Sequence, residues 1–396
     1  MATDITQLGL LLFVSALVAM FTRRLRLPYT VGLVLAGMGL YVAHARIDLQ
    51  LSRDLIFSLF LPPLIFEAAL CIRWTELRRE LPVVTLLATV GVLLAAAVTA
   101  TGMHYGFGWS WGSASVFGIL IAATDPVSVI ATFKEAGVHG RVRLLIESES
   151  LLNDATAAVA FVTALALLAG APDNPAAMAM TLLLAVGGGV FAGLLAGFAF
   201  RLLAGRTSDH LVEFTLTTLA AYGAFFLAEH YHCSGVLAAL TAGLVVGNRA
   251  PRGASNGAHA HSLEIFWEYV AFLANSLIFL LIGAQLAQQH FAELWAPIVL
   301  AIALVTLGRA LAIYPLCALF AGSKLQVPRP QQHVLFWGGL RGALALALAL
   351  ALPADLPDRE AIITLTYSVV VFSVFVQGLT ITPLLRRLGL VSTPPR

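Results

Sequence analysis

Charged residues are scarce in this chain of 396 residues: Asp, Glu, Lys and Arg together make up 11%, whereas 59% of the residues are hydrophobic. The mean hydropathy is +0.90. Soluble globular domains carry about a quarter charged residues, so this composition excludes that class. It predicts an all-α polytopic membrane protein instead.

Cysteine is also scarce, with three widely separated residues at Cys71, Cys233 and Cys317. Each lies in or beside an apolar segment, which is typical of a small core residue. This spacing predicts neither a disulfide framework nor a metal site.

Several catalytic signatures are missing: the sequence has no nucleotide-binding P-loop, no His-Glu-x-x-His motif and no Gly-x-Gly-Asp pattern. ATP-driven transport and the usual intramembrane proteases therefore lack support. We expect no soluble domain, no cofactor, and no nucleotide or nucleic acid as a partner; the expected surroundings are membrane lipid.

Long apolar runs, by contrast, are abundant and predict thirteen membrane spans, numbered here in chain order. Their limits lie near residues 5–21, 29–43, 54–71, 82–103, 112–133, 145–170, 177–204, 211–231, 235–247, 265–288, 294–321, 333–352 and 361–385. Because the basic residues of the first span follow its apolar run, we expect that span to stay uncleaved.

Basic residues alternate between the loops in a way that predicts the orientation. Loops assigned to the inside hold eighteen of them, whereas loops assigned to the outside hold three, Arg46, Arg53 and Arg359. This bias predicts an outside N-terminus and a cytoplasmic C-terminus, which agrees with an odd number of spans. The inside set is Arg23, Arg24, Arg26, Arg73, Arg78, Arg79, Lys134, Arg141, Arg143, Arg201, Arg206, Arg249, Arg252, Lys324, Arg329, Arg386, Arg387 and Arg396.

Spans five and twelve contain residues that interrupt a helix. Pro126 follows Asp125 in span five, and Gly338, Gly339 and Gly342 surround Arg341 in span twelve. Unwound backbone at membrane depth is tolerated where it is buried in protein or lines a cavity. Interrupted segments at corresponding places in two halves of a transporter indicate a binding site in the middle of the membrane.

These two spans correspond if the chain contains two inverted repeats. Repeats at about 1–170 and 211–387, joined by a linker helix at 177–204, would each hold six spans and begin on opposite sides. We expect the whole chain, 1–396, to form a single transmembrane domain.

The most polar stretch within a span reads E-S-E-S-L-L-N-D-A-T-A from Glu147. At about 100° per residue, Glu149, Ser150, Asn153 and Asp154 share one face of a helix. A carboxylate at this depth needs a partner or water, so these side chains are functional candidates.

The other deep carboxyl, Glu67, follows Pro62 and Pro63 in span three. Asp154, Glu67, the Ser150 hydroxyl and the Thr124 carbonyl form a set of hard oxygen ligands that suits sodium. Burial disfavours the charged form of Asp154 and a bound cation favours it, so a proton and a cation compete for this carboxyl.

Two arginines, Arg309 and Arg341, fall inside spans and need buried anions. We expect Glu149 to pair with Arg309 and Asp125 to pair with Arg341, where the second pair would compensate the helix ends at the crossing of the broken spans. The sequence leaves open which acid takes which base.

Together these residues resemble the monovalent cation/proton antiporter-1 family, particularly NhaP-type sodium/proton antiporters. The matching segments are LPPLIFEAAL around Glu67, ATDPVSV around Asp125, ESLLNDA from Glu149, Arg309 in its span, and GGLRGA around Arg341. The resemblance implies an NhaA-like antiporter fold of about thirteen helices with discontinuous crossing helices, and a homodimer whose core domain moves like an elevator. It also implies that Asp154 binds the ion with Glu67, Ser150 and Thr124.

Within this resemblance, Asn153 beside Asp154 implies electroneutral exchange of one sodium for one proton, with roles in sodium transport and pH homeostasis. Lithium and potassium stay open as substrates. The abundance of arginine over lysine and the compact length favour a prokaryotic inner (plasma) membrane protein.

Two other functions remain as alternatives. A cation channel of related fold would need a continuous pore, and the sequence shows no repeated filter motif. A membrane-embedded hydrolase could use Glu67 and Asp154 as an acid and a base, but no nucleophile or metal motif accompanies them. We therefore expect a transporter and not an enzyme.

Overall fold

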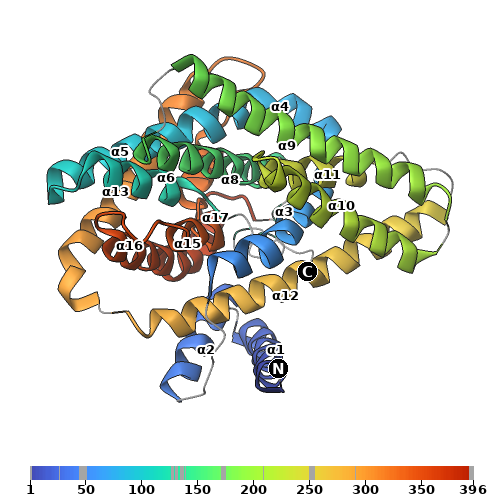
Figure 1. Ribbon diagram of the computed structural model, residues 1–396, viewed down its shortest axis with the longest axis horizontal. Helices are drawn as coiled ribbons and strands as arrows, with labels where there is room; N and C mark the ends of the chain where they lie inside the picture. Colours follow the sequence, from blue (N-terminus) through green and yellow to red (C-terminus); the bar gives the residue numbers. More distant parts are fainter. Residues whose placement is uncertain are drawn as a thin grey trace. The chain divides into compact units, whose positions relative to one another are not determined.

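Every element that the structure describes is a helix, from α1 (Ala2–Leu25) to α17 (Gly378–Arg387) (Figure 1). The computed structural model describes residues 2–25, 27–43, 51–125, 129, 133, 138, 140–170, 175–207, 209–248, 255–289 and 291–391. These residues form two compact units. The first comprises Met1–Arg53, Pro82–Ala157 and Ser276–Arg396, and the second comprises Asp54–Leu81 and Ala158–Asn275.

Helices that can cross a membrane account for most of the described chain. Seven are long and apolar enough by length and composition: Trp74–Phe107, Arg141–Leu168, Ala179–Ala204, His210–His230, His261–Leu286, Trp295–Ala318 and Arg359–Arg387. Five shorter apolar helices accompany them: Gln7–Thr22, Tyr29–Val42, Leu55–Leu70, Trp111–Ala122 and Gly235–Gly247. A helix satisfies its backbone hydrogen bonds internally, which explains why apolar segments in lipid adopt this form.

Each of the thirteen predicted spans has a helical counterpart, so the predicted all-helical fold class is confirmed. The ends differ by several residues where polar residues continue a helix beyond its apolar part. For example, α8 begins at Arg141 rather than near residue 145, and α12 begins at Ser255 rather than near 265.

The first unit contains the discontinuous helices. Its elements are α1, α2 (Tyr29–Val42), the π-helical turn η2 (Leu87–Gly91), α5 (Val92–Phe107), α6 (Trp111–Ala122), the 3₁₀ turn η3 (Phe291–Leu294), α13 (Trp295–Ala318), α14 (Arg329–Trp337), α15 (Ala343–Leu350), α16 (Arg359–Phe372), the π-helical turn η4 (Ser373–Gln377) and α17. Parts of α4 (Trp74–Leu86), α8 (Arg141–Leu168) and α12 (Ser255–Leu286) also belong to it.

Within this unit, α5 packs against α6 and α13, and α15 packs against α16 and α6 (Figure 1). Close approach between α2 and α12 depends on Gly37 and Gly283, because a Cβ atom at either position would strike the backbone of the other helix. Small residues allow such contact between membrane helices.

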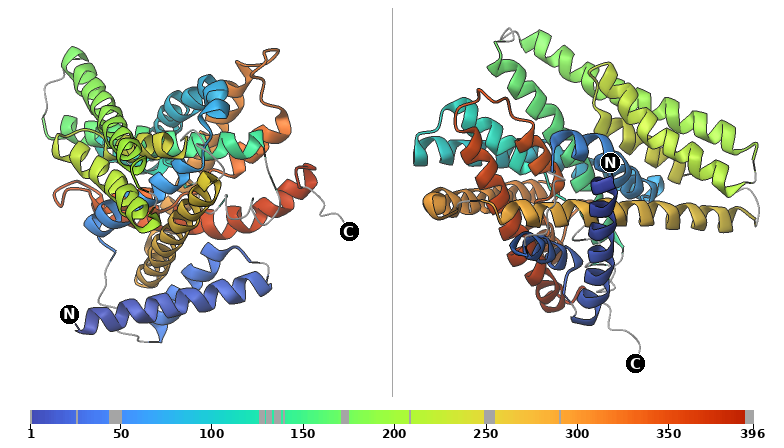
Figure 2. Two further views of the ribbon diagram at one scale, coloured as in Figure 1. Left: turned by 90° about the vertical axis from the view of Figure 1, so that its right-hand side faces the viewer. Right: turned by 60° about the horizontal axis from the view of Figure 1, so that its bottom comes forward.

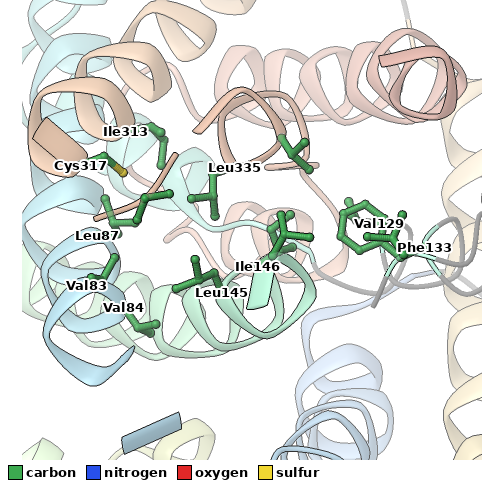
Figure 3. Packing of buried hydrophobic residues seen from close by; sticks show 14 of the residues in the cluster. Val83, Val84, Leu87, Val129, Phe133, Leu145, Ile146, Ile313, Cys317 and Leu335 are labelled. Carbon is green, nitrogen blue, oxygen red and sulfur yellow. The ribbon is translucent and has the colours of Figure 1, made fainter. Parts of the chain in front are cut away.

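An apolar core supports the polar part of α8. Val83 and Val84 from α4, Leu145 and Ile146 from α8, and Leu335 from α14 gather in one buried cluster (Figure 3). This cluster fixes the first turns of α8 against α14, which are the elements that carry the polar residues described below.

The second unit contains the π-helical turn η1 (Leu55–Phe60), α3 (Leu61–Leu70), α9 (Pro175–Ala204), α10 (His210–His230) and α11 (Gly235–Gly247), with parts of α4, α8 and α12. Helices α9, α10 and α11 lie side by side (Figure 2). In its core Phe66 and Trp267 have ring centroids 4.6 Å apart, and the Trp267 indole N–H donates to Thr217 Oγ1 at 3.1 Å. Buried tryptophan commonly needs such a partner.

Both predicted interruptions are present. Helix α6 ends at Ala122 and residues 123–125 are not helical, while residues 338–342 separate α14 from α15. The two unwound segments touch, because the Asp125 backbone N–H donates to the Leu340 carbonyl at 2.7 Å. Pro126, which prompted the first prediction, lies outside the described residues.

The predicted inverted repeats stay a prediction. Each compact unit draws residues from both proposed repeats, 1–170 and 211–387, so the units follow packing and not the repeat boundaries.

Candidate functional site

Four polar side chains on α8 form a buried wall in the first unit. Glu149 and Ser150 are each 1% exposed, Asn153 is 0% exposed and Asp154 is 8% exposed. Hydrophobic neighbours cannot satisfy these groups, so their burial requires specific polar partners.

Thr124 connects the unwound segment after α6 to this wall. Its hydroxyl donates to Ser150 Oγ at 3.1 Å, and it accepts a hydrogen bond from Asn153 Nδ2 at 3.2 Å. The same Asn153 nitrogen donates to Glu149 Oε1 at 3.3 Å. Both amide hydrogens of Asn153 are thereby used, and they hold Thr124 and Glu149 in fixed positions.

Glu149 forms a two-pronged ion pair with Arg309 of α13, as the sequence predicted. Arg309 Nη1 lies 2.7 Å from Glu149 Oε1, and Nη2 lies 2.8 Å from Oε2. Nη2 also donates to the Leu335 carbonyl of α14 at 3.0 Å. Since both carboxylate oxygens are occupied, Glu149 joins α8 to α13 and α14 rather than offering a free ligand.

Arg341 binds backbone carbonyls at the crossing of the broken helices. Its Nη1 donates to the carbonyls of Ala122 and Ala123 at 2.5 and 2.9 Å. These carbonyls end α6, where backbone acceptors lack partners within the helix and carry partial negative charge. The guanidinium therefore compensates a helix C-terminus.

Asp125 occupies the complementary position at the other broken helix. Its carboxylate packs directly against Gly342, the residue that precedes α15, and a Cβ atom on Gly342 would overlap it. A carboxylate is favourable near the N-terminus of a helix. Each charge thus lies at the end of the opposite helix, which fits the predicted role at the crossing, and a direct ion pair between Asp125 and Arg341 stays a prediction.

Asp154 differs from Glu149 in its hydrogen bonding. Within the described part of the chain, neither Asp154 Oδ1 nor the neighbouring Asn153 Oδ1 has a hydrogen-bond partner, although both are buried. A buried acceptor without a donor is costly unless a cation, a proton or water satisfies it. Carboxylate and amide oxygens are ligands that suit a hard cation.

Glu67 lies on α3 in the second unit, about one turn before Cys71, whose sulfur is 4.0 Å from Glu67 Oε1. Its place beside Asp154 and the ligand role of the Thr124 carbonyl remain predictions. The structure does bring together Thr124, Glu149, Ser150, Asn153 and Arg309 through hydrogen bonds.

Sequence reasoning missed two buried polar residues in η4. Ser373 Oγ accepts a hydrogen bond from the Arg341 backbone N–H at 2.7 Å and donates to Gln377 Oε1 at 2.9 Å. The sequence does contain a pattern that indicates these two residues: Ser373 and Gln377 are polar residues four positions apart in an apolar span, with the same spacing as Glu149 and Asn153.

Comparison with known proteins agrees with the fold. The family described as sodium/hydrogen exchanger, transmembrane, matches residues 9–387. A low-affinity Na⁺/H⁺ antiporter, NhaS1 of Synechocystis sp., is 38% identical over 381 residues, covering 94% of this chain and 71% of that protein. The Na⁺/H⁺ antiporter NhaH of Halobacillus aidingensis is 34% identical over 398 residues, covering 97% of this chain and 98% of that protein.

A solved structure shares the fold at low sequence identity. The sodium proton antiporter MjNhaP1 of Methanocaldococcus jannaschii aligns with a TM-score of 0.74 and 20% identity, covering 98% of this chain and 97% of that chain. By the match across nearly its whole length, the chain belongs to the sodium/hydrogen exchanger family and is a multi-pass membrane protein.

Proposed function

We propose that this protein is a secondary active transporter that exchanges sodium ions for protons by alternating access to a site at Asp154. It is a transporter and not an enzyme. The observation that carries the proposal is the buried Asp154 carboxylate with an unpartnered oxygen, on a helix face joined to the crossing of two broken helices. The antiporter activity named for its relatives supports the same function.

Exchange follows from competition at one carboxylate. When Asp154 is ionised, a sodium ion bound with Ser150, Thr124 and Glu67 supplies the compensating positive charge. When Asp154 is protonated, its negative charge is lost and its affinity for sodium falls. A carrier that reorients only in these two neutral forms moves one ion in each direction.

The neighbouring residues support a ratio of one sodium to one proton. Glu147 is paired with Arg143 and Glu149 with Arg309, and Asn153 carries no charge. Asp154 is therefore the carboxylate of α8 that is left to bind a transported ion. One carboxylate binds one sodium or one proton, which makes the exchange electroneutral. Lithium and potassium are further candidate substrates.

The proposal extends to a homodimer in a prokaryotic plasma membrane, with the N-terminus outside and the C-terminus in the cytoplasm. The distribution of basic residues between loops supports this orientation. The homodimer is taken from the resemblance to NhaP-type antiporters.

Proton flux in proteoliposomes tests the proposal. Addition of sodium outside acid-loaded vesicles should drive proton efflux with the wild-type protein, and Asp154→Asn should abolish it. Glu76→Gln is the matched control, because Glu76 is an exposed acid paired with Arg73. Efflux that persists in Asp154→Asn would refute the assignment of the site, and sodium current that follows voltage without proton movement would indicate a channel.

A further inference from the structure

The unwound segment at residues 338–342 carries backbone groups that no helix satisfies. Arg341 is 3% exposed, so its backbone N–H must find an acceptor inside the protein. That acceptor is the hydroxyl of Ser373, which is itself 0% exposed and lies 2.7 Å away. A side chain on another span therefore holds the segment in place.

The Ser373 hydroxyl is oriented by Gln377. A serine hydroxyl has one hydrogen to donate, and here that hydrogen goes to Gln377 Oε1 at 2.9 Å. The oxygen lone pairs are then free to accept from Arg341. Gln377 thus orients the Ser373 hydroxyl so that its oxygen accepts the hydrogen bond from the Arg341 backbone N–H.

Other hydroxyls on the same span behave differently. Ser368 donates to the Thr364 carbonyl at 2.8 Å, and Thr366 donates to the Ile362 carbonyl at 2.7 Å, so each bonds to its own helix. Ser373 and Gln377 instead bound the π-helical turn η4. Single π-helical turns often occur at functional sites, because they redirect side chains that a regular helix would keep on its own surface.

The held segment connects directly to the transport site. Leu340 accepts from the Asp125 backbone, and the Arg341 side chain holds Ala122 and Ala123. Thr124 lies between these contacts and bonds to Ser150 on α8. Gln377 also lines a small pocket together with Arg309 and Arg341.

We propose that Ser373 and Gln377 are positioning residues for the ion site: they fix the Arg341 backbone, and through it the Thr124 segment, in the geometry that binds the transported cation. The inference rests on the proposed function. Loss of the Ser373 hydroxyl leaves the Arg341 N–H without its acceptor, the unwound segment shifts, and Thr124 moves relative to Ser150 and Asp154. The effect falls on ion binding more than on the maximal rate.

The experiment measures sodium-dependent proton flux of purified variants in proteoliposomes over a range of sodium concentrations. Ser373→Ala should raise the sodium KM roughly tenfold and leave the maximal rate within about twofold, since a buried hydrogen bond is lost at the binding segment. Gln377→Leu should raise the KM several-fold. Ser373→Thr keeps the hydroxyl and should restore a KM close to that of the wild type.

Ser368→Ala is the matched control, because it removes a hydroxyl that bonds within its own helix; it should leave both kinetic constants unchanged. The double variant Ser373→Ala/Gln377→Leu should show a KM no higher than that of Ser373→Ala, because the two side chains act in series. If Ser373→Ala does not fold, Gln377→Leu alone decides the matter, since it leaves the hydroxyl in place.

An unchanged KM in both Ser373→Ala and Gln377→Leu would overturn the inference, as would a loss of maximal rate without a change in KM. Failure of the wild-type protein to exchange would instead refute the proposed function, so the two failures can be told apart.

Discussion

At the scale of single residues, two carboxylates of α8 that lie five residues apart, Glu149 and Asp154, have different hydrogen-bonding states. Glu149 has both oxygens bound by Arg309 and a further donor from Asn153, whereas Asp154 retains a buried oxygen that receives no donor from the residues the structure describes. A carboxylate that is fully paired resists protonation and cation binding, whereas one with an open oxygen can take either. From this difference we infer that Glu149 has a structural role and that Asp154 binds the transported ions.

Removal of Arg309 should destabilise the protein strongly. Arg309→Ala leaves the Glu149 carboxylate buried without its base, which costs about 3–5 kcal/mol. We expect a clear fall in the melting temperature in detergent, and Glu149→Gln in the same chain should recover part of it. Arg73→Ala is the control, because its ion pair with Glu76 is exposed and worth at most about 1 kcal/mol. Equal melting temperatures for the two arginine variants would contradict this role for Glu149.

Asn153 should determine the charge balance of exchange. In Asn153→Asp a second titratable carboxyl stands beside Asp154, and the donor that Asn153 gives to Glu149 is lost. We expect this variant to carry an additional proton, so that an imposed membrane potential changes its exchange rate while the wild type stays insensitive. The measurement is flux at potassium potentials set with valinomycin. A wild-type rate that depends on voltage would refute electroneutral exchange.

At the scale of elements, the crossing of the broken helices depends on charges placed at helix ends. Arg341 binds the last carbonyls of α6, and Asp125 packs at the residue before α15, so each half of the crossing compensates the other. The backbone bond from Asp125 to Leu340 joins the two unwound segments directly. These contacts tie the two broken helices to each other at both helix ends and along the backbone.

This arrangement makes a prediction that an ion pair would not make. Arg341→Ala should lower the yield of folded protein and the melting temperature, because the α6 carbonyls lose their donor. Adding Asp125→Asn should not restore stability, since the aspartate compensates a separate helix end. Restoration of stability in the double variant would show that a direct ion pair between the two residues dominates.

Several of these elements were predictable from sequence, for a local reason. Gly338, Gly339 and Gly342 weaken a helix wherever they occur together, so the interruption around Arg341 could be read directly. The partner of the Arg341 side chain could not be predicted from sequence, because it consists of backbone carbonyls. Every residue has a backbone carbonyl, so such a partner leaves no pattern in the sequence. Ser373 was missed for a related reason: hydroxyls in membrane helices commonly bond to their own helix, as Ser368 does.

At the scale of the whole molecule, the all-helical fold class followed from hydropathy, whereas the division into two packed units did not. Apolar length is a property of each segment alone. The units depend on which helices pack together, and α8 contributes residues to both. The bias of basic residues between loops predicts the orientation of the chain in the membrane, and helix packing within the protein does not test that orientation.

That orientation can be tested with single cysteines in a chain freed of Cys71, Cys233 and Cys317. Asp355→Cys lies in an exposed loop assigned to the outside, and Lys324→Cys lies in an exposed loop assigned to the cytoplasm. An impermeant maleimide should label the first in intact cells and the second only after the membrane is opened. Labelling in the reverse order would invert the topology.

The most direct test of the central claim is the number of protons released when sodium binds to the purified protein in weakly buffered detergent solution, followed with a pH indicator. If Asp154 holds either ion, saturating sodium should release nearly one proton for each sodium bound at a pH below the midpoint of the titration of Asp154, and about half a proton at the midpoint itself, where half of the carboxyls are protonated. Asp154→Asn should release none. Sodium binding without proton release in the wild type, or release that persists in Asp154→Asn, would contradict the claim that both ions share this carboxylate.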